Sequence, residues 1–181
     1  MSLFMREGGI LGVFSFATYL QLFSTALGRI NKELTKPFIY LVPEPPFAKL
    51  VHNLREMLPG ALVEASVIFI PVGMILGLNG PEICACILAR FSFSLLFAAG
   101  NIIVERFWSG ASKVLTFFLY FMVMVVLSAP GVALAMVISS NLLLLSENFT
   151  IFLVMAIVNI PVSLLVLFLC RNMLQYAELN Y

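Results

Sequence analysis

The sequence predicts an all-α, polytopic integral membrane protein, and three observations carry this prediction. Of its 181 residues, 62% are hydrophobic, only 10% are charged, and the apolar residues gather in long continuous stretches. Soluble domains carry about 25% charged residues, and about a third of the surface of such a chain stays exposed after folding. Water-soluble enzymes and disordered chains are therefore excluded. The net charge of +1 also offers no electrostatic basis for binding nucleic acid.

Five stretches are long and apolar enough to cross a bilayer, which takes about 20 helical residues. The first is the weakest, because Ser, Thr, Tyr and Gln interrupt it. No basic segment with a cleavage site precedes it, so no removable signal peptide is expected. The predicted spans, all within a single transmembrane domain covering residues 1–181, are residues 8–27, 61–78, 83–104, 114–139 and 150–169.

Glycine and proline residues predict how these spans are connected and shaped. The tetrapeptide from Asn79 to Glu82 contains both residue types, which predicts a tight turn and an antiparallel hairpin of the second and third spans. Pro130 removes a backbone hydrogen bond within the fourth span, so we expect a kink or a break there. Pro71 and Pro161 are expected to bend the second and fifth spans.

The only extended polar stretch is a predicted cytoplasmic link over residues 28–60. Its first half is rich in basic residues and proline. Apolar residues then recur at helical spacing, which predicts an amphipathic helix from Phe47 to Leu58. Such a helix lies on the membrane surface or docks on a partner. The apolar face has Phe47, Leu50, Val51, Leu54 and Leu58, and the polar face has Lys49, His52, Asn53, Arg55 and Glu56.

The positions of the basic residues predict the topology. If the spans cross in sequence order, eight of the ten Lys and Arg residues fall on one side, one falls on the other, and Arg90 lies within the third span. The positive-inside rule makes the richer side cytoplasmic. We therefore expect a multi-pass membrane protein with its N-terminus outside and its C-terminus inside. This topology, without a signal peptide, also suggests an odd number of further helices upstream.

Four polar residues in the predicted spans are candidates for function: Glu64, Arg90, Asn101 and Asn159. A charge at membrane depth costs at least about 2.5 kcal/mol, so Arg90 should face the protein interior or a wet cavity, or extend to the interface. Arg90 either has a role in a transport pathway or forms a structural pair with another side chain. Glu64 is expected near the inner boundary, at a different depth from Arg90, so the sequence does not assure a direct pair. Asn101 and Asn159 are expected to form interhelical hydrogen bonds.

No catalytic, cofactor-binding or metal-ligating set is recognisable, and no such group is expected. Asp is absent, which removes aspartyl intramembrane protease chemistry. No glycine-rich phosphate loop is present, so a separate chain must bind any ATP that drives transport. The three cysteines, Cys84, Cys86 and Cys170, lie in apolar segments and are interpreted as packing residues.

Three segments between Glu33 and Trp108 form a distinctive pattern: ELTKPFIYLVPEPPFAKL, IFIPVGMILG and LLFAAGNIIVERFW. They resemble the putative ABC exporter family of Firmicutes, whose members are membrane permeases that pair with a separate ATPase. The resemblance implies that this chain matches the C-terminal half of a longer permease. It also implies that the link contains a helix that couples to the ATPase, unless that helix is an interfacial anchor. The candidate coupling residues are Phe47, Lys49, Leu50, Leu54 and Arg55.

The leading hypothesis is a permease subunit, or a C-terminal fragment, of an ATP-driven exporter. Its expected partners are the lipid bilayer, a cytoplasmic ABC ATPase, and either further subunits or a missing N-terminal half. The alternative is a non-transport membrane protein that acts in assembly, immunity or interaction. An intramembrane enzyme is a third class, although Glu64, Glu105 and His52 do not converge at one depth. A secondary transporter also stays open.

Overall fold

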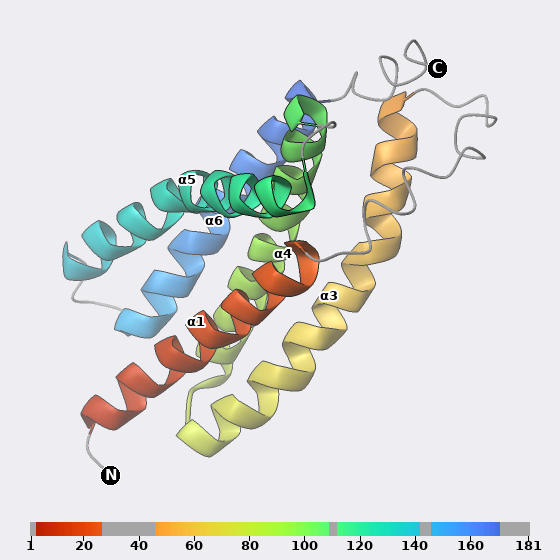
Figure 1. Cartoon of the computed structure of the whole chain (residues 1–181). Helices are drawn as coiled ribbons and strands as arrows, with labels where there is room; N and C mark the ends of the chain where they lie inside the picture. Colours follow the sequence, from red (N-terminus) through yellow and green to blue (C-terminus); the bar gives the residue numbers. More distant parts are fainter. Residues whose placement is uncertain (1–2, 27–45, 109–111, 142–145, 171–181) are drawn as a thin grey trace, which may run out of the picture.

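In the part of the chain that it describes, the structure is a bundle of five helices, which confirms the predicted all-α class (Figure 1). This computed structural model describes residues 3–26, 46–108, 112–141 and 146–170. The bundle consists of α1 (Leu3–Ala26), α3 (Pro46–Leu76), α4 (Gly80–Trp108), α5 (Lys113–Asn141) and α6 (Glu147–Leu169).

Each of the five predicted spans coincides with one of these helices. Among the described residues, four helices are long and apolar enough to cross a membrane, namely α4, α5, α6 and the part of α3 from Leu58 to Leu76. The apolar part of α1, from Gly9 to Thr25, is shorter. The sequence therefore predicted all five described helices. The length and composition of α1 do not establish that it crosses the membrane.

The expected hairpin of α3 and α4 is closed by caps on both helices. Gly77 has a φ of 65°, a left-handed conformation that glycine adopts without steric cost. The Leu78 amide N–H donates to the Gly73 carbonyl oxygen at 2.9 Å, as in a Schellman motif that ends a helix. The Asn79 amide N–H donates to the Glu82 carboxylate at 2.9 Å, which satisfies a free donor at the start of α4. These bonds hold the two helices antiparallel.

The segment predicted to form an amphipathic helix is helical, but it is continuous with the second span. Helix α3 runs unbroken from Pro46 to Leu76 and contains Pro59 and Pro71. Both prolines are exposed, so their rings need no space inside the bundle. Because the apolar span begins only at Leu58, residues 46–57 extend α3 beyond it (Figure 1).

Pro130 and Pro161 likewise lie inside continuous helices, α5 and α6 respectively. A break at Pro130, one of the two outcomes expected there, is therefore not present. The missing N–H of Pro130 still removes the usual donor to the carbonyl oxygen of Val126.

Helix α4 is the central helix of the bundle and contacts the other four helices. Among the four candidate spans, α4 is the most enclosed and α5 the least. A Cβ atom on Gly100 would overlap the Met124 side chain of α5. Glycine therefore permits the close approach of α4 and α5 that the small residues at positions 98–100 predict.

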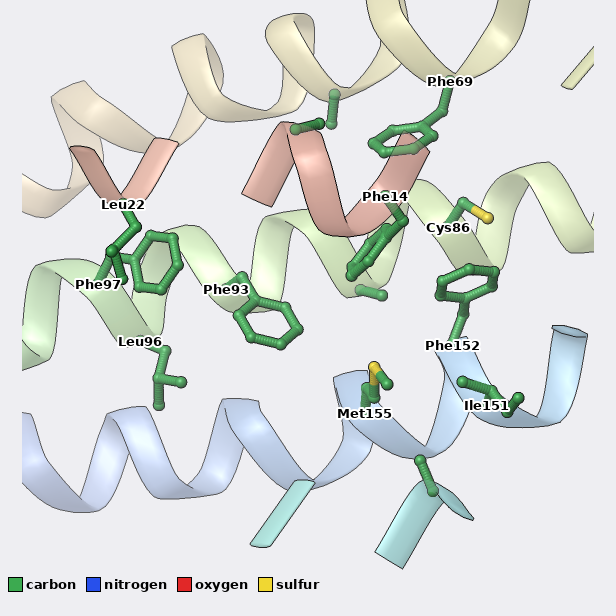
Figure 2. Close-up of a cluster of buried hydrophobic side chains, with 14 of the residues drawn as sticks. Phe14, Leu22, Phe69, Cys86, Phe93, Leu96, Phe97, Ile151, Phe152 and Met155 are labelled. Carbon is green, nitrogen blue, oxygen red and sulfur yellow. The ribbon is translucent and has the colours of Figure 1, made fainter. Parts of the chain in front are cut away.

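The aromatic ring of Phe14 joins α1 to three other helices (Figure 2). Its centroid lies 5.7 Å from that of Phe69 on α3, 5.8 Å from that of Phe93 on α4 and 4.8 Å from that of Phe152 on α6. All four rings are buried, and these separations are typical of favourable aromatic pairs. Phe14 is therefore a central anchor of α1 in the core, where Ile10, Ala17 and Leu22 of the same helix are also buried.

Several sequence-based expectations fall outside the described residues. These are the proline-rich half of the link, including the stretch from Glu33 to Pro43, and the C-terminal segment from Arg171 onward. At Phe47, Lys49, Leu50 and Leu54 only the backbone is described, so the predicted amphipathic pattern stays a prediction.

We expect that Phe14→Ala lowers the free energy of unfolding by about 3–5 kcal/mol, because it removes a large buried side chain and leaves a cavity. Phe16→Ala is the matched control, since Phe16 lies on the same helix and is 65% exposed. Unfolding of both variants in detergent micelles, followed by circular dichroism during titration with dodecyl sulfate, would measure the difference. Equal losses in the two variants would contradict the anchoring role of Phe14.

Candidate functional site

An ion pair inside the membrane-spanning part of the bundle is the centre of the candidate site. Arg90 on α4 donates from Nη2 to Oε1 of Glu64 on α3 at 3.0 Å. The Arg90 side chain is 2% exposed, whereas that of Glu64 is 53% exposed. The pair therefore joins a buried cation to a carboxylate at the edge of the bundle.

The pair corrects the expectation that Glu64 and Arg90 lie at different depths. That expectation placed Glu64 by its distance from the start of the second span and Arg90 by its distance from the start of the third span. These two starts lie at opposite boundaries of the membrane. Counted instead from the α3–α4 turn, Glu64 lies about three helical turns before Leu76 and Arg90 about three turns after Gly80. In an antiparallel hairpin these positions face each other, and the long Arg side chain spans the remaining distance.

Hydrogen bonds also join α1 to the backbone of α4 at Arg90. Gln21 Nε2 donates to Ser94 Oγ at 2.6 Å, and Ser94 Oγ donates to the Arg90 carbonyl oxygen at 3.2 Å. Thr18 lies one helical turn before Gln21. We refer to Thr18, Gln21, Glu64, Arg90 and Ser94 as the polar layer. It brings together side chains from α1, α3 and α4.

Three buried polar atoms of this layer have no hydrogen-bond partner among the described residues. They are Thr18 Oγ1, Gln21 Oε1 and Arg90 Nη1. A buried polar atom without a partner costs about 1–3 kcal/mol, and membrane interiors offer no bulk water to replace one. The polar layer therefore has capacity for further hydrogen bonds, with both a donor and acceptors.

The exposure of Glu64 is unusual for a carboxylate at this depth. Glu64 lies within the apolar span of α3, and the neighbouring Val63 and Val67 are even more exposed. Valine is stable against lipid tails, whereas an ionised carboxylate is not. Glu64 must therefore meet water or polar groups, whereas Val63 and Val67 can meet lipid.

The two candidate asparagines are both buried, but among the described residues Asn159 lacks the interhelical hydrogen bond expected of it. Asn159 on α6 is fully buried, and neither of its side-chain amide atoms has a partner among the described residues. A Cβ atom on Gly131 of α5 would overlap its Oδ1 atom. Asn159 therefore occupies the space that Gly131 leaves, directly after Pro130. Asn101 on α4 is also buried.

The candidate coupling residues all lie on the part of α3 that extends beyond the span. The backbone is helical at Phe47, Lys49, Leu50, Leu54 and Arg55, and the Arg55 side chain is exposed. Arg55 lies about 13 Å along the helix axis from Glu64 at 1.5 Å per residue. One helix therefore carries both the candidate coupling segment and the carboxylate of the intramembrane pair.

The polar layer contains three residues that sequence reasoning passed over: Thr18, Gln21 and Ser94. Thr18 and Gln21 contribute to the polarity that makes the first apolar stretch the weakest, and their spacing of three residues places them on one face of a helix. That spacing was a usable signal. Ser94 carried no such signal, because a single serine in an apolar helix commonly bonds its own backbone.

The comparison with protein families gives a match over nearly the whole chain. The family model described as a putative ABC exporter matches residues 1–178. No curated protein and no solved structure matches the chain. The match covers both the α3 extension and the polar layer.

We expect Glu64→Gln to lower the free energy of unfolding by about 3 kcal/mol, because it leaves the Arg90 charge buried without a counter-charge. Arg90→Met should cost less, about 1 kcal/mol, since the remaining carboxylate is half exposed. The double variant should be more stable than Glu64→Gln alone. Dodecyl sulfate titrations of the four proteins would test this order. The interpretation fails if Arg90→Met is the more damaging single change.

A second prediction concerns the contact of α5 with α6. Gly131→Ala should lower the free energy of unfolding by about 2 kcal/mol, because its methyl group would overlap Asn159 in a packed interface. Gly12→Ala is the control, since nothing lies within 4 Å of a Cβ atom there, and it should be neutral or slightly stabilising. The same titration measures both, and a neutral Gly131→Ala would show that α5 and α6 do not pack so closely.

Proposed function

Because the chain belongs to the putative ABC exporter family, we propose that it is the membrane permease of an ATP-driven exporter whose ATPase is a separate chain. Family membership indicates a membrane transport component, in agreement with the four helices long enough to cross a bilayer. Export, the separate ATPase and the mechanism belong to the proposal. Its expected location is the bacterial cell membrane.

The observation that carries the proposal is the continuity of α3. The helix runs from Pro46 to Leu76 without interruption and projects beyond its apolar span. A force applied to residues 46–57 is transmitted along the helix into the bundle, because a continuous helix resists bending more than a loop does. Pro59 removes one backbone hydrogen bond at the junction, the one to the Arg55 carbonyl oxygen, but the helix continues through it. Movement of an ATPase bound there would therefore displace Glu64 relative to Arg90.

The arrangement of the helices supports a cytoplasmic position for the α3 extension. Figure 1 shows each of the consecutive helices α3, α4, α5 and α6 running broadly opposite to the one before it, with α5 inclined to the others. The described helices from α3 to α6 therefore alternate. Alternation gathers the α3 extension and the start of α5 at one end of the bundle, where Lys49, Arg55, Arg106 and Lys113 occur in the sequence. The positive-inside rule favours the cytoplasm for that end.

The polar layer favours transport over a role limited to assembly, immunity or interaction. Such a role needs packed surfaces but no charged pair within the span. A carboxylate that is half exposed at membrane depth is expensive unless it serves a polar pathway. We therefore assign the polar layer to the route of the exported molecule.

The coupling role is tested by charging the predicted apolar face of the α3 extension. We expect Leu50→Glu with Leu54→Glu to abolish co-purification of the cognate ATPase, because two carboxylates would be placed in an apolar contact. The protein should still insert and fold, since the changes lie outside the apolar span. Affinity purification of the tagged permease, with the ATPase detected by immunoblot, gives the readout.

The matched control is His52→Glu with Asn53→Glu, which introduces two carboxylates on the opposite face of the same segment. This variant should retain the ATPase. If the leucine variant retains the ATPase as well and still supports export, the α3 extension is not the coupling element and serves as an anchor.

A further inference from the structure

We propose that the polar layer binds a zwitterionic group, one that carries an anionic oxygen and an ammonium a few ångströms apart. This inference rests on the proposed function, because it names the chemical class of the exported molecule. The observation behind it is the incomplete pairing of Glu64 with Arg90.

An arginine and a carboxylate that serve only structure commonly pair through two parallel hydrogen bonds. Here a single bond joins Arg90 Nη2 to Glu64 Oε1. Arg90 Nη1 is buried without a partner among the described residues, and the Glu64 side chain is half exposed. The pair therefore leaves one guanidinium nitrogen available to an anion and a carboxylate available to a cation.

The charge of the layer decides between classes of ligand. Glu64 and Arg90 together are neutral, so a purely anionic group that approaches Arg90 is repelled by Glu64, and a purely cationic group is repelled by Arg90. A zwitterion can place its anionic oxygen on Arg90 Nη1 and its ammonium beside Glu64.

The position of Glu64 indicates how the ligand enters. Glu64 is the exposed member of the layer, whereas Arg90 and Ser94 are buried. A ligand would therefore approach from the flank of α3, level with the apolar span, rather than through the centre of the bundle, where Phe14 and Phe69 pack together. Zwitterionic groups of this kind are a lipid headgroup in the bilayer or the same phosphodiester headgroup free in water.

The test measures the apparent unfolding temperature of the purified full chain in the neutral detergent dodecyl maltoside. Three probes are added separately: lysophosphatidylethanolamine, lysophosphatidylglycerol with the same acyl chain, and free glycerophosphoethanolamine. We expect an increase of about 3 °C with the zwitterionic lipid, because a ligand that binds only the folded state stabilises it. The anionic lipid should give no comparable increase. A response to glycerophosphoethanolamine as well would identify the free headgroup as sufficient, whereas a response to the lipid alone would identify a membrane source.

Variants locate the binding site. Glu64→Gln and Arg90→Gln should each lose the response to the zwitterionic lipid, while Val63→Gln, a control on the lipid-facing side of the same helix, should keep it. Equal shifts with the two lipids in the wild-type protein, or no shift with any probe, would overturn the proposal even if both charge variants failed to fold. No ATPase is present in this assay, so its outcome is independent of the co-purification test of the exporter function.

Discussion

A guanidinium held inside a membrane bundle requires a counter-charge, and the pairing of Arg90 with Glu64 meets that requirement at 3.0 Å. This contact fixes the register of α3 against α4, the helix around which the others pack. It also places a carboxylate on a flank where lipid alone would be unfavourable. The need to keep both charges stable therefore determines where the bundle has to admit water or polar groups.

Helix α1 divides the interior into two chemical environments. Its Phe14 ring packs against Phe69 and Phe152 in an apolar cluster (Figure 2), whereas Gln21, about two turns later, bonds Ser94 in the polar layer. Phe69 lies between Glu64 and the α3–α4 turn along α3. On α4, however, Phe93 of the same cluster lies between Arg90 and Ser94. The aromatic cluster and the polar layer therefore adjoin each other in the interior of the bundle.

Much of the fold was predictable, because long apolar helices are specified by composition and their ends by glycine, proline and caps. Three features were not. The continuity of α3 through Pro59 and Gly60 was not expected, because both residue types disfavour a helix interior, although both are exposed here. The Glu64–Arg90 pair depends on which residues of α3 and α4 lie at the same depth in the hairpin. Counting each residue from a different membrane boundary placed them at different depths, so the pair was not predicted. The packing of Asn159 was also not predicted. Its side chain fills the space beside Gly131 of α5, where its amide atoms have no hydrogen-bond partner among the described residues.

The central claim is that Glu64 faces water or polar groups while the adjacent surface of α3 faces lipid. The direct measurement is the rate at which a charged, membrane-impermeant thiol reagent modifies Glu64→Cys and Val63→Cys, each in a chain whose three native cysteines are replaced. Val63 is 63% exposed, so exposure alone would make both thiols reactive. The structural account predicts rapid modification at position 64 and little at position 63. Equal reactivity at the two positions, or none at position 64, would contradict it.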